Sequence, residues 1–243
     1  MKLFLIYISI ICFSCTSSHT KKTFDGNGDR NDSAYDFKTA SHDGIGKYYM
    51  GREIAHVMGA AASDWLERPE RDDEESTELA IARIPLSANS VVADLGAGTG
   101  YYSFKIAKRI PLGKVYAIDV QEAMLRQLKA KKLVVQDTVV EVIKGSEQSI
   151  NLPASSTDLV IMVDVYHELS YPKEILESIY KALKPSGKIL LLEYRQEDPS
   201  IPIKELHKMS VQQVNKEMDA NGFRLSKKED FLPIQHFLLY EKK

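Results

Sequence analysis

An acid and three alternating glycines stand together in the segment VVADLGAGTGYY, residues 91–102. Two β-branched residues precede Asp94 and a helical pattern begins at Tyr101, so the segment predicts a strand, a tight turn and a helix. The glycines of the turn are Gly96, Gly98 and Gly100. Such a turn leaves bare backbone N–H groups at a helix N-terminus, where an anionic or nucleotide-like ligand binds.

The carboxylate of Asp94 favours a ligand with a positively charged group over a dinucleotide. A dinucleotide-binding turn has the pattern Gly-x-Gly-x-x-Gly, and in this chain the third glycine position holds Tyr101. A carboxylate at Asp94 repels a pyrophosphate and attracts an ammonium group. S-adenosylmethionine carries an ammonium group, a carboxylate and ribose hydroxyls. We therefore expect S-adenosylmethionine as the cofactor, and an NAD-dependent oxidoreductase is disfavoured.

A second acid lies where a ribose would be bound. Asp119 ends the apolar stretch VYAID, 19 positions after Gly100. The ribose-binding acid of related folds follows the glycine turn by roughly 20 residues. We expect Asp119 to bind the ribose; the alternative is a solvated carboxylate at a strand end.

Alternating strand and helix patterns surround these residues and must position them. Nearly continuous apolar runs predict strands at residues 114–120, 139–143, 159–165 and 188–194, and helical spacing predicts helices at 121–131 and 173–183. The tail predicts a helix within 210–223 and two strands, around 224–231 and 236–241. Before the glycine turn, residues 48–65 and 77–84 predict two N-terminal helices. The fold class is α/β, with seven strands and helices on both faces.

Four segments in this order resemble the motifs of class I S-adenosylmethionine-dependent methyltransferases: VVADLGAGTGYY, VYAIDVQEAML, DLVIMVDVYHEL and LKPSGKILLLEYR. The resemblance implies a Rossmann-like, doubly wound sheet of seven strands whose last strand is antiparallel. It also implies that Asp94 and the turn from Gly96 to Gly100 hold the methionine part of the cofactor and that Asp119 holds the ribose.

The chain departs from that family after the third predicted strand. Ser146 stands where the family often has an acid that contacts adenine, and Glu147 is the candidate to replace it. Asp164 stands where the family often has a polar residue facing the cofactor or the substrate. An exposed loop position for Glu147 and a structural role for Asp164 are equal alternatives.

Two residues after the fourth predicted strand are candidates for chemistry on the methyl acceptor. Methyl transfer is an in-line displacement, so the protein orients the acceptor and takes its proton. His167 and Glu168 suit that task as catalytic residues; alternatively they begin a helix or bond to nearby backbone. The sequence spacing of His167, Glu168 and His207 matches no ligand pattern, so we expect no metal. His207, with Lys204 and Lys208, lines the mouth of the site or belongs to a solvated loop.

The charge balance limits the partners. The chain has 32 basic and 34 acidic residues, a net charge of −2, so it lacks the broad basic field that attracts nucleic acid. We expect methyl transfer to a small-molecule acceptor; the alternative is a membrane-tethered S-adenosylmethionine-binding protein without catalysis. The sequence does not determine the oligomeric state.

The N-terminus predicts export. An apolar run from Leu3 to Phe13 is too short to cross a bilayer and is typical of a signal peptide, here residues 1–14. Ser14 before Cys15 resembles a bacterial lipoprotein signal, in which the cysteine is lipidated. Residues 15–46 are polar enough to form a flexible tether to a domain at 47–243. We expect a lipid-anchored protein at the membrane of a bacterial cell envelope, with a cytoplasmic protein as the alternative.

Overall fold

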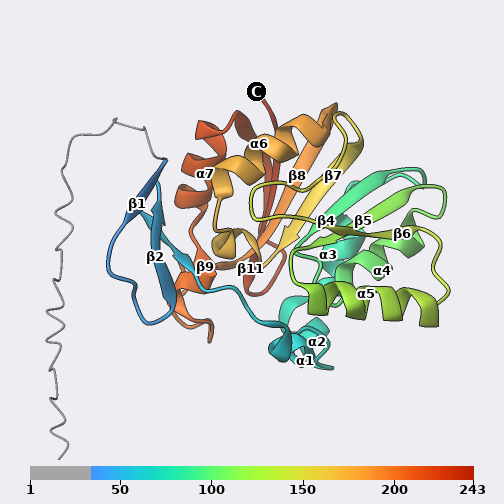
Figure 1. Cartoon of the computed structure of the whole chain (residues 1–243), viewed down its shortest axis with the longest axis horizontal. Helices are drawn as coiled ribbons and strands as arrows, with labels where there is room; N and C mark the ends of the chain where they lie inside the picture. The colour runs from blue at the N-terminus through green and yellow to red at the C-terminus, as the bar shows by residue number, and fades with distance from the viewer. Residues whose placement is uncertain (1–33) are drawn as a thin grey trace, which may run out of the picture. The chain divides into compact units, whose positions relative to one another are not determined.

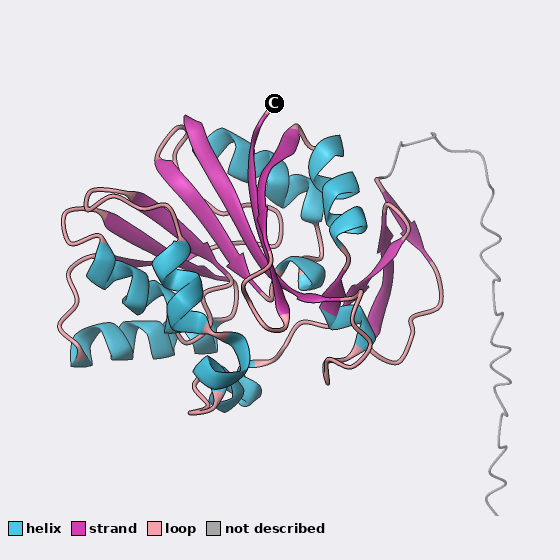
Figure 2. Ribbon diagram, turned by 180° about the vertical axis from the view of Figure 1, so that it is seen from behind, coloured by secondary structure: helices cyan, strands magenta, loops and turns pink. Residues whose placement is uncertain are grey.

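Long apolar runs build the central sheet of the structure, a computed structural model that describes residues 34–243. The strands of this sheet are β4 (Val91–Leu95), β5 (Lys114–Asp119), β6 (Val140–Lys144), β7 (Thr157–Val163), β8 (Leu183–Arg195), β10 (Phe223–Glu229) and β11 (Gln235–Lys242), with the short β9 (Lys208–Met209) paired to the end of β8. Their order is β10-β11-β8-β7-β4-β5-β6. Strands β4 to β8 are parallel, and β11 is antiparallel to both of its neighbours (Figure 2). The predicted doubly wound α/β fold is confirmed.

Helices cover both faces of this sheet (Figure 1). One face carries α3 (Thr77–Arg83), α4 (Tyr101–Arg109) and α5 (Glu122–Val134); the other carries α6 (Pro172–Ala182) and α7 (Val211–Ala220). Side chains along a strand alternate between the faces. Leu190 and Leu192 accordingly join the first core, and Ile189 and Leu191 join the second. Two buried faces require consecutive apolar residues, as at 189–192 of β8.

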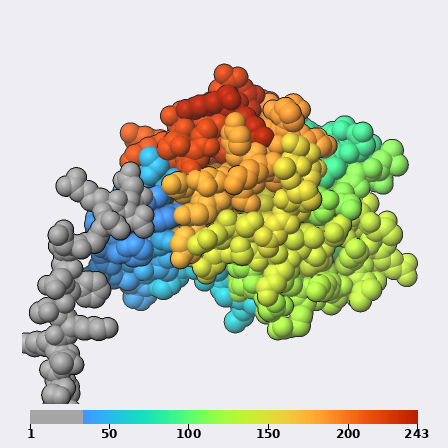
Figure 3. Space-filling view, turned by 45° about the horizontal axis from the view of Figure 1, so that its top comes forward, coloured from blue at the N-terminus to red at the C-terminus, as the bar shows by residue number. Residues whose placement is uncertain are grey.

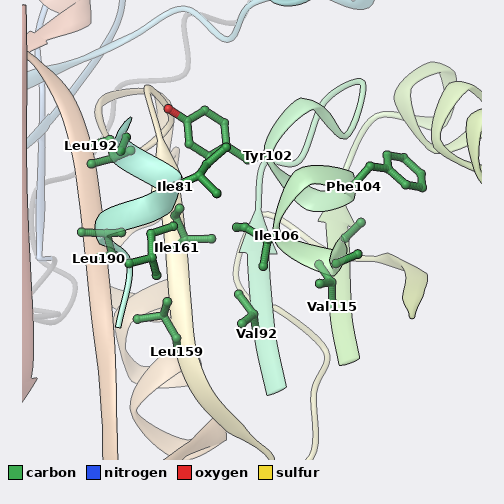
Figure 4. Packing of buried hydrophobic residues seen from close by; sticks show 14 of the residues in the cluster. Ile81, Val92, Tyr102, Phe104, Ile106, Val115, Leu159, Ile161, Leu190 and Leu192 are labelled. Atoms are coloured by element: carbon green, nitrogen blue, oxygen red, sulfur yellow. The ribbon is translucent and has the colours of Figure 1, made fainter. Parts of the chain in front are cut away.

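The first core lies under α3 and α4. Figure 4 shows Val92 of β4, Ile161 of β7 and Leu190 of β8 side by side, with Ile106 of α4 near them. All four side chains are fully buried. Burying them stabilises the three strands whose carboxyl ends carry the predicted site residues.

The connections place those strand ends around one crevice. From β4 the chain winds outward to β5 and β6, then returns to β7 on the other side of β4. In an open α/β sheet, ligands bind at such a switch point, beyond the carboxyl ends of the strands. The loops after β4 and β7 therefore face the same space.

The N-terminal segment differs from its prediction. Residues 34–55 form a three-stranded antiparallel sheet of β1 (Tyr35–Phe37), β2 (Gly44–Tyr49) and β3 (Arg52–Ala55). The helix predicted over 48–65 was therefore wrong up to residue 55, and the tether predicted over 15–46 was wrong from residue 35 on, where β1 and β2 lie. Short helices follow: η1 (Ala60–Ala62), α1 (Ser63–Leu66) and α2 (Arg71–Glu75). Of the two predicted N-terminal helices, the second is confirmed as α3.

The physical reason for the difference is that this small sheet is held by distant parts of the chain. A left-handed backbone at Met50 and Gly51 turns β2 into β3. The Arg52 guanidinium donates to Glu217 of α7 at 2.8 and 3.0 Å, and Lys173 N donates to Tyr35 Oη at 3.2 Å. Figure 3 shows the blue N-terminal residues packed against orange residues of the second half of the chain.

The remaining N-terminal predictions lie outside the described residues. They concern the signal peptide at 1–14, lipidation of Cys15 and most of the tether, and they stay predictions. Within residues 34–243, no helix combines the length and the apolar character needed to span a bilayer.

The packing of the core predicts how one substitution changes the free energy of unfolding. Ile161 is fully buried between the two neighbouring strands of β7. Ile161→Ala should lower the free energy of unfolding by about 2–5 kcal/mol, because it removes buried methyl groups and leaves a cavity. Urea denaturation measures this, with Leu112→Ala, at a side chain that is 79% exposed, as the control. Equal losses in the two variants would contradict the assignment of Ile161 to the core.

Candidate active site

The turn after β4 is built by its glycines. Gly96 has φ +72°, and a Cβ on it would lie 2.6 Å from the Val165 side chain. The N–H groups of Gly96 and Ala97 both donate to Ile118 O, at 2.8 and 3.0 Å, which fastens the turn to β5. Gly98 also has a left-handed backbone, and its N–H donates to Asp119 Oδ2 at 3.0 Å. Only glycine fits the close approach at residue 96.

A cavity of about 400 Å³ lies beside this turn, a size suited to a small-molecule ligand. Eight of the ten predicted site residues line it: Gly96, Gly98, Asp119, Ser146, Glu147, Asp164, His167 and Glu168. Ser146 and Glu147 are exposed at its rim, in a tight turn where Ser146 N donates to Ser149 O. The structure thus brings together residues from the ends of β4, β5, β6 and β7.

The other two predicted residues do not line the cavity. Asp94 is buried under the turn, and its Oδ2 accepts a hydrogen bond from Ser103 Oγ at 2.5 Å. Gly100 precedes α4 with φ +82°, where a Cβ would lie 2.6 Å from the Phe104 ring. Both residues shape the turn from behind instead of facing the ligand space, so the prediction that Asp94 faces an ammonium group has no support in this geometry.

Asp119 lies at the wall of the cavity. Its Oδ2 accepts from Gly98 N, and its Oδ1 accepts from Gln121 N at 2.8 Å. Burial raises the pKa of Asp119, although these backbone N–H groups act in the opposite direction. Each carboxylate oxygen still has a lone pair for a ligand hydroxyl.

Asp164 has an unsatisfied carboxylate oxygen. Its Oδ2 accepts from Gln235 Nε2 at 2.7 Å, whereas its buried Oδ1 has no hydrogen-bond partner among residues 34–243. Burial, followed by the nearby Glu75 and Glu193 carboxylates, raises the pKa of Asp164 well above its ordinary value. The backbone at Asp164 is left-handed, with φ +52°. A strained residue with an unpaired buried oxygen is typical of a ligand site.

The loop after β7 carries a histidine held by a buried acid. His167 belongs to η2 (Tyr166–Glu168), and its Nδ1 lies 2.6 Å from Glu193 Oε2. Glu193 Oε1 accepts from the backbone N–H groups of Val165 and Tyr166, at 3.2 and 2.7 Å. A carboxylate in this position holds the proton on Nδ1, so the lone pair of His167 is on Nε2. Glu168 Oε1 accepts from Met58 N at 3.1 Å.

A second histidine meets the first. His207 belongs to η3 (Glu205–His207), and its Nδ1 lies 3.1 Å from His167 Nε2. Glu168 Oε1 is 3.4 Å from His207 Nδ1 and 3.8 Å from His167 Nε2. All three residues line the cavity. The arrangement can accept a proton, orient an acidic group or hold a cation.

Sequence reasoning missed two residues of this site. Arg71 of α2 lines the cavity, donating to Glu75 Oε2 and to Leu66 O, both at 2.9 Å. It stands in the charged segment between the two predicted N-terminal helices, and no sequence signal marks it. Glu193 is a single acid within the apolar run of β8, and an acid in a strand buried on both faces was a usable signal.

Comparisons with known proteins agree with this geometry. Residues 93–191 match a family described as a methyltransferase domain. YdaC of Bacillus subtilis, an uncharacterized methyltransferase, is 30% identical over 152 residues, or 63% of this chain and 81% of the relative. A demethylmenaquinone methyltransferase of Lactococcus lactis is 28% identical over 113 residues, which are 46% of this chain and 44% of the relative. The match therefore spans less than half of that relative's length.

A solved structure is similar over most of its length. The crystal structure of a SAM dependent methyltransferase from Aquifex aeolicus matches with a TM-score of 0.71 and 26% sequence identity. The match covers 76% of this chain and 98% of that chain.

The buried Asp94 predicts a pH dependence. Burial raises its pKa from 3.8 to about 6, so the folded chain binds this proton more tightly than the unfolded chain. The contribution of Asp94 to the free energy of unfolding therefore falls as the pH rises from about 4 to about 6, and stays constant above. Relative to Asp94→Asn, the wild type should lose about 3 kcal/mol between pH 4 and pH 7, measured by urea unfolding. A difference that is flat across this range would contradict the assignment.

Proposed function

Since the chain belongs to the class I S-adenosylmethionine-dependent methyltransferases, we propose that it methylates a small, largely apolar molecule that carries an ionisable hydroxyl group. The observation that carries this proposal is His167, whose Nε2 lone pair stands at the cavity while Glu193 holds the opposite nitrogen. Apolar side chains form much of the remaining wall, among them Val57, Met58 and Trp65. A mainly apolar acceptor with one acidic group suits that lining.

Two residues of the cavity suit the methionine part of S-adenosylmethionine. The unpaired Oδ1 of Asp164 would receive the ammonium group, which would offset the cost of burying this carboxylate. The Arg71 guanidinium lines the same cavity and would receive the methionine carboxylate. When bound, the cofactor supplies a methyl group activated by a sulfonium centre. We propose that Asp94 supports the turn through Ser103 without touching the ligand.

Other residues suit the adenosine part. We propose that Asp119 receives the ribose hydroxyls, because its carboxylate is fixed at the wall by the Gly98 and Gln121 N–H groups. Ser146 and Glu147 stand at the exposed rim and are the proposed contacts for adenine. Gly96 and Gly98 line the cavity, so the backbone of the turn would contact the bound cofactor.

We propose His167 as the residue that takes the acceptor's proton. Glu193 fixes the ring and favours the proton on Nδ1, so Nε2 would accept the acceptor's proton once the acceptor displaces its contact with His207 Nδ1. Glu168, whose Oε1 is anchored by Met58 N, orients the acceptor beside it. Taking the proton leaves an oxygen nucleophile, and the walls hold it in line for displacement.

Cofactor binding tests the ribose assignment. Asp119→Ala should weaken the affinity for S-adenosylmethionine by about 1–3 kcal/mol, because charge-assisted hydrogen bonds to the ribose are lost. Isothermal titration calorimetry measures the dissociation constant. Glu177→Ala, at an exposed position of α6, is the matched control. An affinity equal to that of the control variant would remove Asp119 from the site.

Turnover tests the role of the histidine. Glu193→Gln keeps an oxygen for the two backbone N–H groups but places an amide N–H against His167 Nδ1, which favours the wrong tautomer. We expect kcat to fall by about 10²–10⁴-fold, with little change in the affinity for S-adenosylmethionine. The assay measures S-adenosylhomocysteine formation with a panel of hydroxylated aromatic compounds, using their methyl ethers as blanks.

A matched control separates this effect from general damage. Glu197→Gln changes an acid that pairs with His236 at 2.9 Å, outside the cavity lining, and should keep wild-type turnover. Wild-type kcat in Glu193→Gln would show that His167 does not act as the base. Failure of the wild type to methylate any hydroxyl compound, while it methylates a thiol or an amine, would overturn the proposed acceptor class.

A further inference from the structure

Three metal-ligating side chains converge at one wall of the cavity. His167 Nε2, His207 Nδ1 and Glu168 Oε1 are separated by 3.1, 3.4 and 3.8 Å. The residues come from η2 and η3, which follow β7 and β8, and His167 and His207 are 40 positions apart in the sequence. The His167 side chain is 2% exposed, Glu168 is 13% and His207 is 18%.

A carboxylate lies behind each of the two histidine rings. His167 Nδ1 is held by Glu193, and His207 Nε2 lies 3.1 Å from Asp43 Oδ2. His167 Nδ1 makes a hydrogen-bonding contact with Glu193, whereas neither His207 Nε2 nor Asp43 Oδ2 has a hydrogen-bond partner among residues 34–243. His167 Nε2, His207 Nδ1 and Glu168 Oε1 lie on the other side of the rings, close enough together for one cation to contact all three. Histidines backed by carboxylates in this way are the usual arrangement around a bound metal.

The distances and the donor types indicate which ion. Donors about 2.0–2.1 Å from a tetrahedral zinc ion lie about 3.3–3.4 Å apart, and the three observed separations bracket that value. Magnesium and calcium prefer oxygen donors, whereas two imidazoles and one carboxylate suit zinc and the neighbouring transition metals. Glu193 and Asp43 add negative charge around the cluster, and Lys204, which donates to Asp43 Oδ1 at 2.6 Å, offsets part of it.

We propose that His167, Glu168 and His207 bind a zinc-type divalent ion that keeps one coordination position open toward the cavity. Three protein ligands with an open position are typical of catalytic rather than structural zinc. The ion's role rests on the proposed function: it would bind the acceptor's hydroxyl oxygen and stabilise the oxyanion, and the hydroxyl proton would pass to water at the cavity mouth, where Ser146 and Glu147 are exposed. His167 would then act as a ligand instead of a base. The binding site itself does not depend on that role.

Metal titration of the full-length chain tests the site directly. The protein carries no affinity tag, contains Cys12→Ser and Cys15→Ser so that no thiolate competes, and is stripped with a chelator. Calorimetry with Zn²⁺ should show one ion per chain. Co²⁺ should give the intense visible absorption of a four- or five-coordinate ion.

Variants locate the ion. Glu168→Gln and His207→Asn should each weaken Zn²⁺ binding at least tenfold, and Glu193→Gln should weaken it about 10–100-fold through the orientation of His167. His56→Asn, at an exposed histidine outside the cluster, is the control and should bind as the parent does. Circular dichroism of the stripped variants checks that each is folded.

The outcomes separate the two proposals. No binding of Zn²⁺ or Co²⁺, or binding that survives both Glu168→Gln and His207→Asn, overturns the metal site. Full methyl transfer by the stripped protein, with loss in Glu193→Gln, also overturns the ion's role and leaves His167 as the base. Stoichiometric binding without transfer to any hydroxyl compound supports the metal site and overturns the proposed acceptor.

Discussion

The buried carboxylate of Glu193 is the interaction on which the site depends. It is fully buried near the end of β8, where an ionised group is tolerated only if its oxygens are paired. Both oxygens are paired with the loop after β7, through two backbone N–H groups and His167 Nδ1. One side chain therefore shapes that loop, joins it to the neighbouring strand and decides which nitrogen of His167 faces the cavity.

Burial also disfavours the ionised form of three aspartates near Glu193. Asp164, Asp119 and Asp94 all lie around or beneath the cavity, and burial raises the pKa of each. Acids that are costly to ionise reduce the stability of the free protein, and a ligand with a positive charge or hydroxyl donors relieves part of that cost. This accumulation of acids in the crevice is consistent with a site shaped for a ligand at the expense of the empty fold.

The N-terminal sheet and short helices complete the site from outside the central sheet. Arg52 of β3 donates to His167 O at 3.1 Å and pairs with Glu217 of α7. Met58 N holds Glu168, and Asp43 lies behind His207. The segment before the glycine turn thus contacts the proposed catalytic residues from behind, and it also brings Arg71 to the cavity. Residues that precede the methyltransferase domain match contribute to the same cavity.

The sequence by itself determined what depends on neighbouring residues. The apolar runs of β4 to β8, the glycine turn and Asp119 at the end of β5 follow from local periodicity, because a strand buried on both faces must be apolar throughout. The convergence of His167 with His207, the pairing of Glu193 with His167, and the arrival of Arg71 at the cavity were decided only by the tertiary structure. They depend on strand order and on which side chain of a strand or loop faces the crevice. The N-terminal strands belong to this second group as well, since contacts with α6 and α7 outweigh the helical spacing of Ile54, Val57 and Met58.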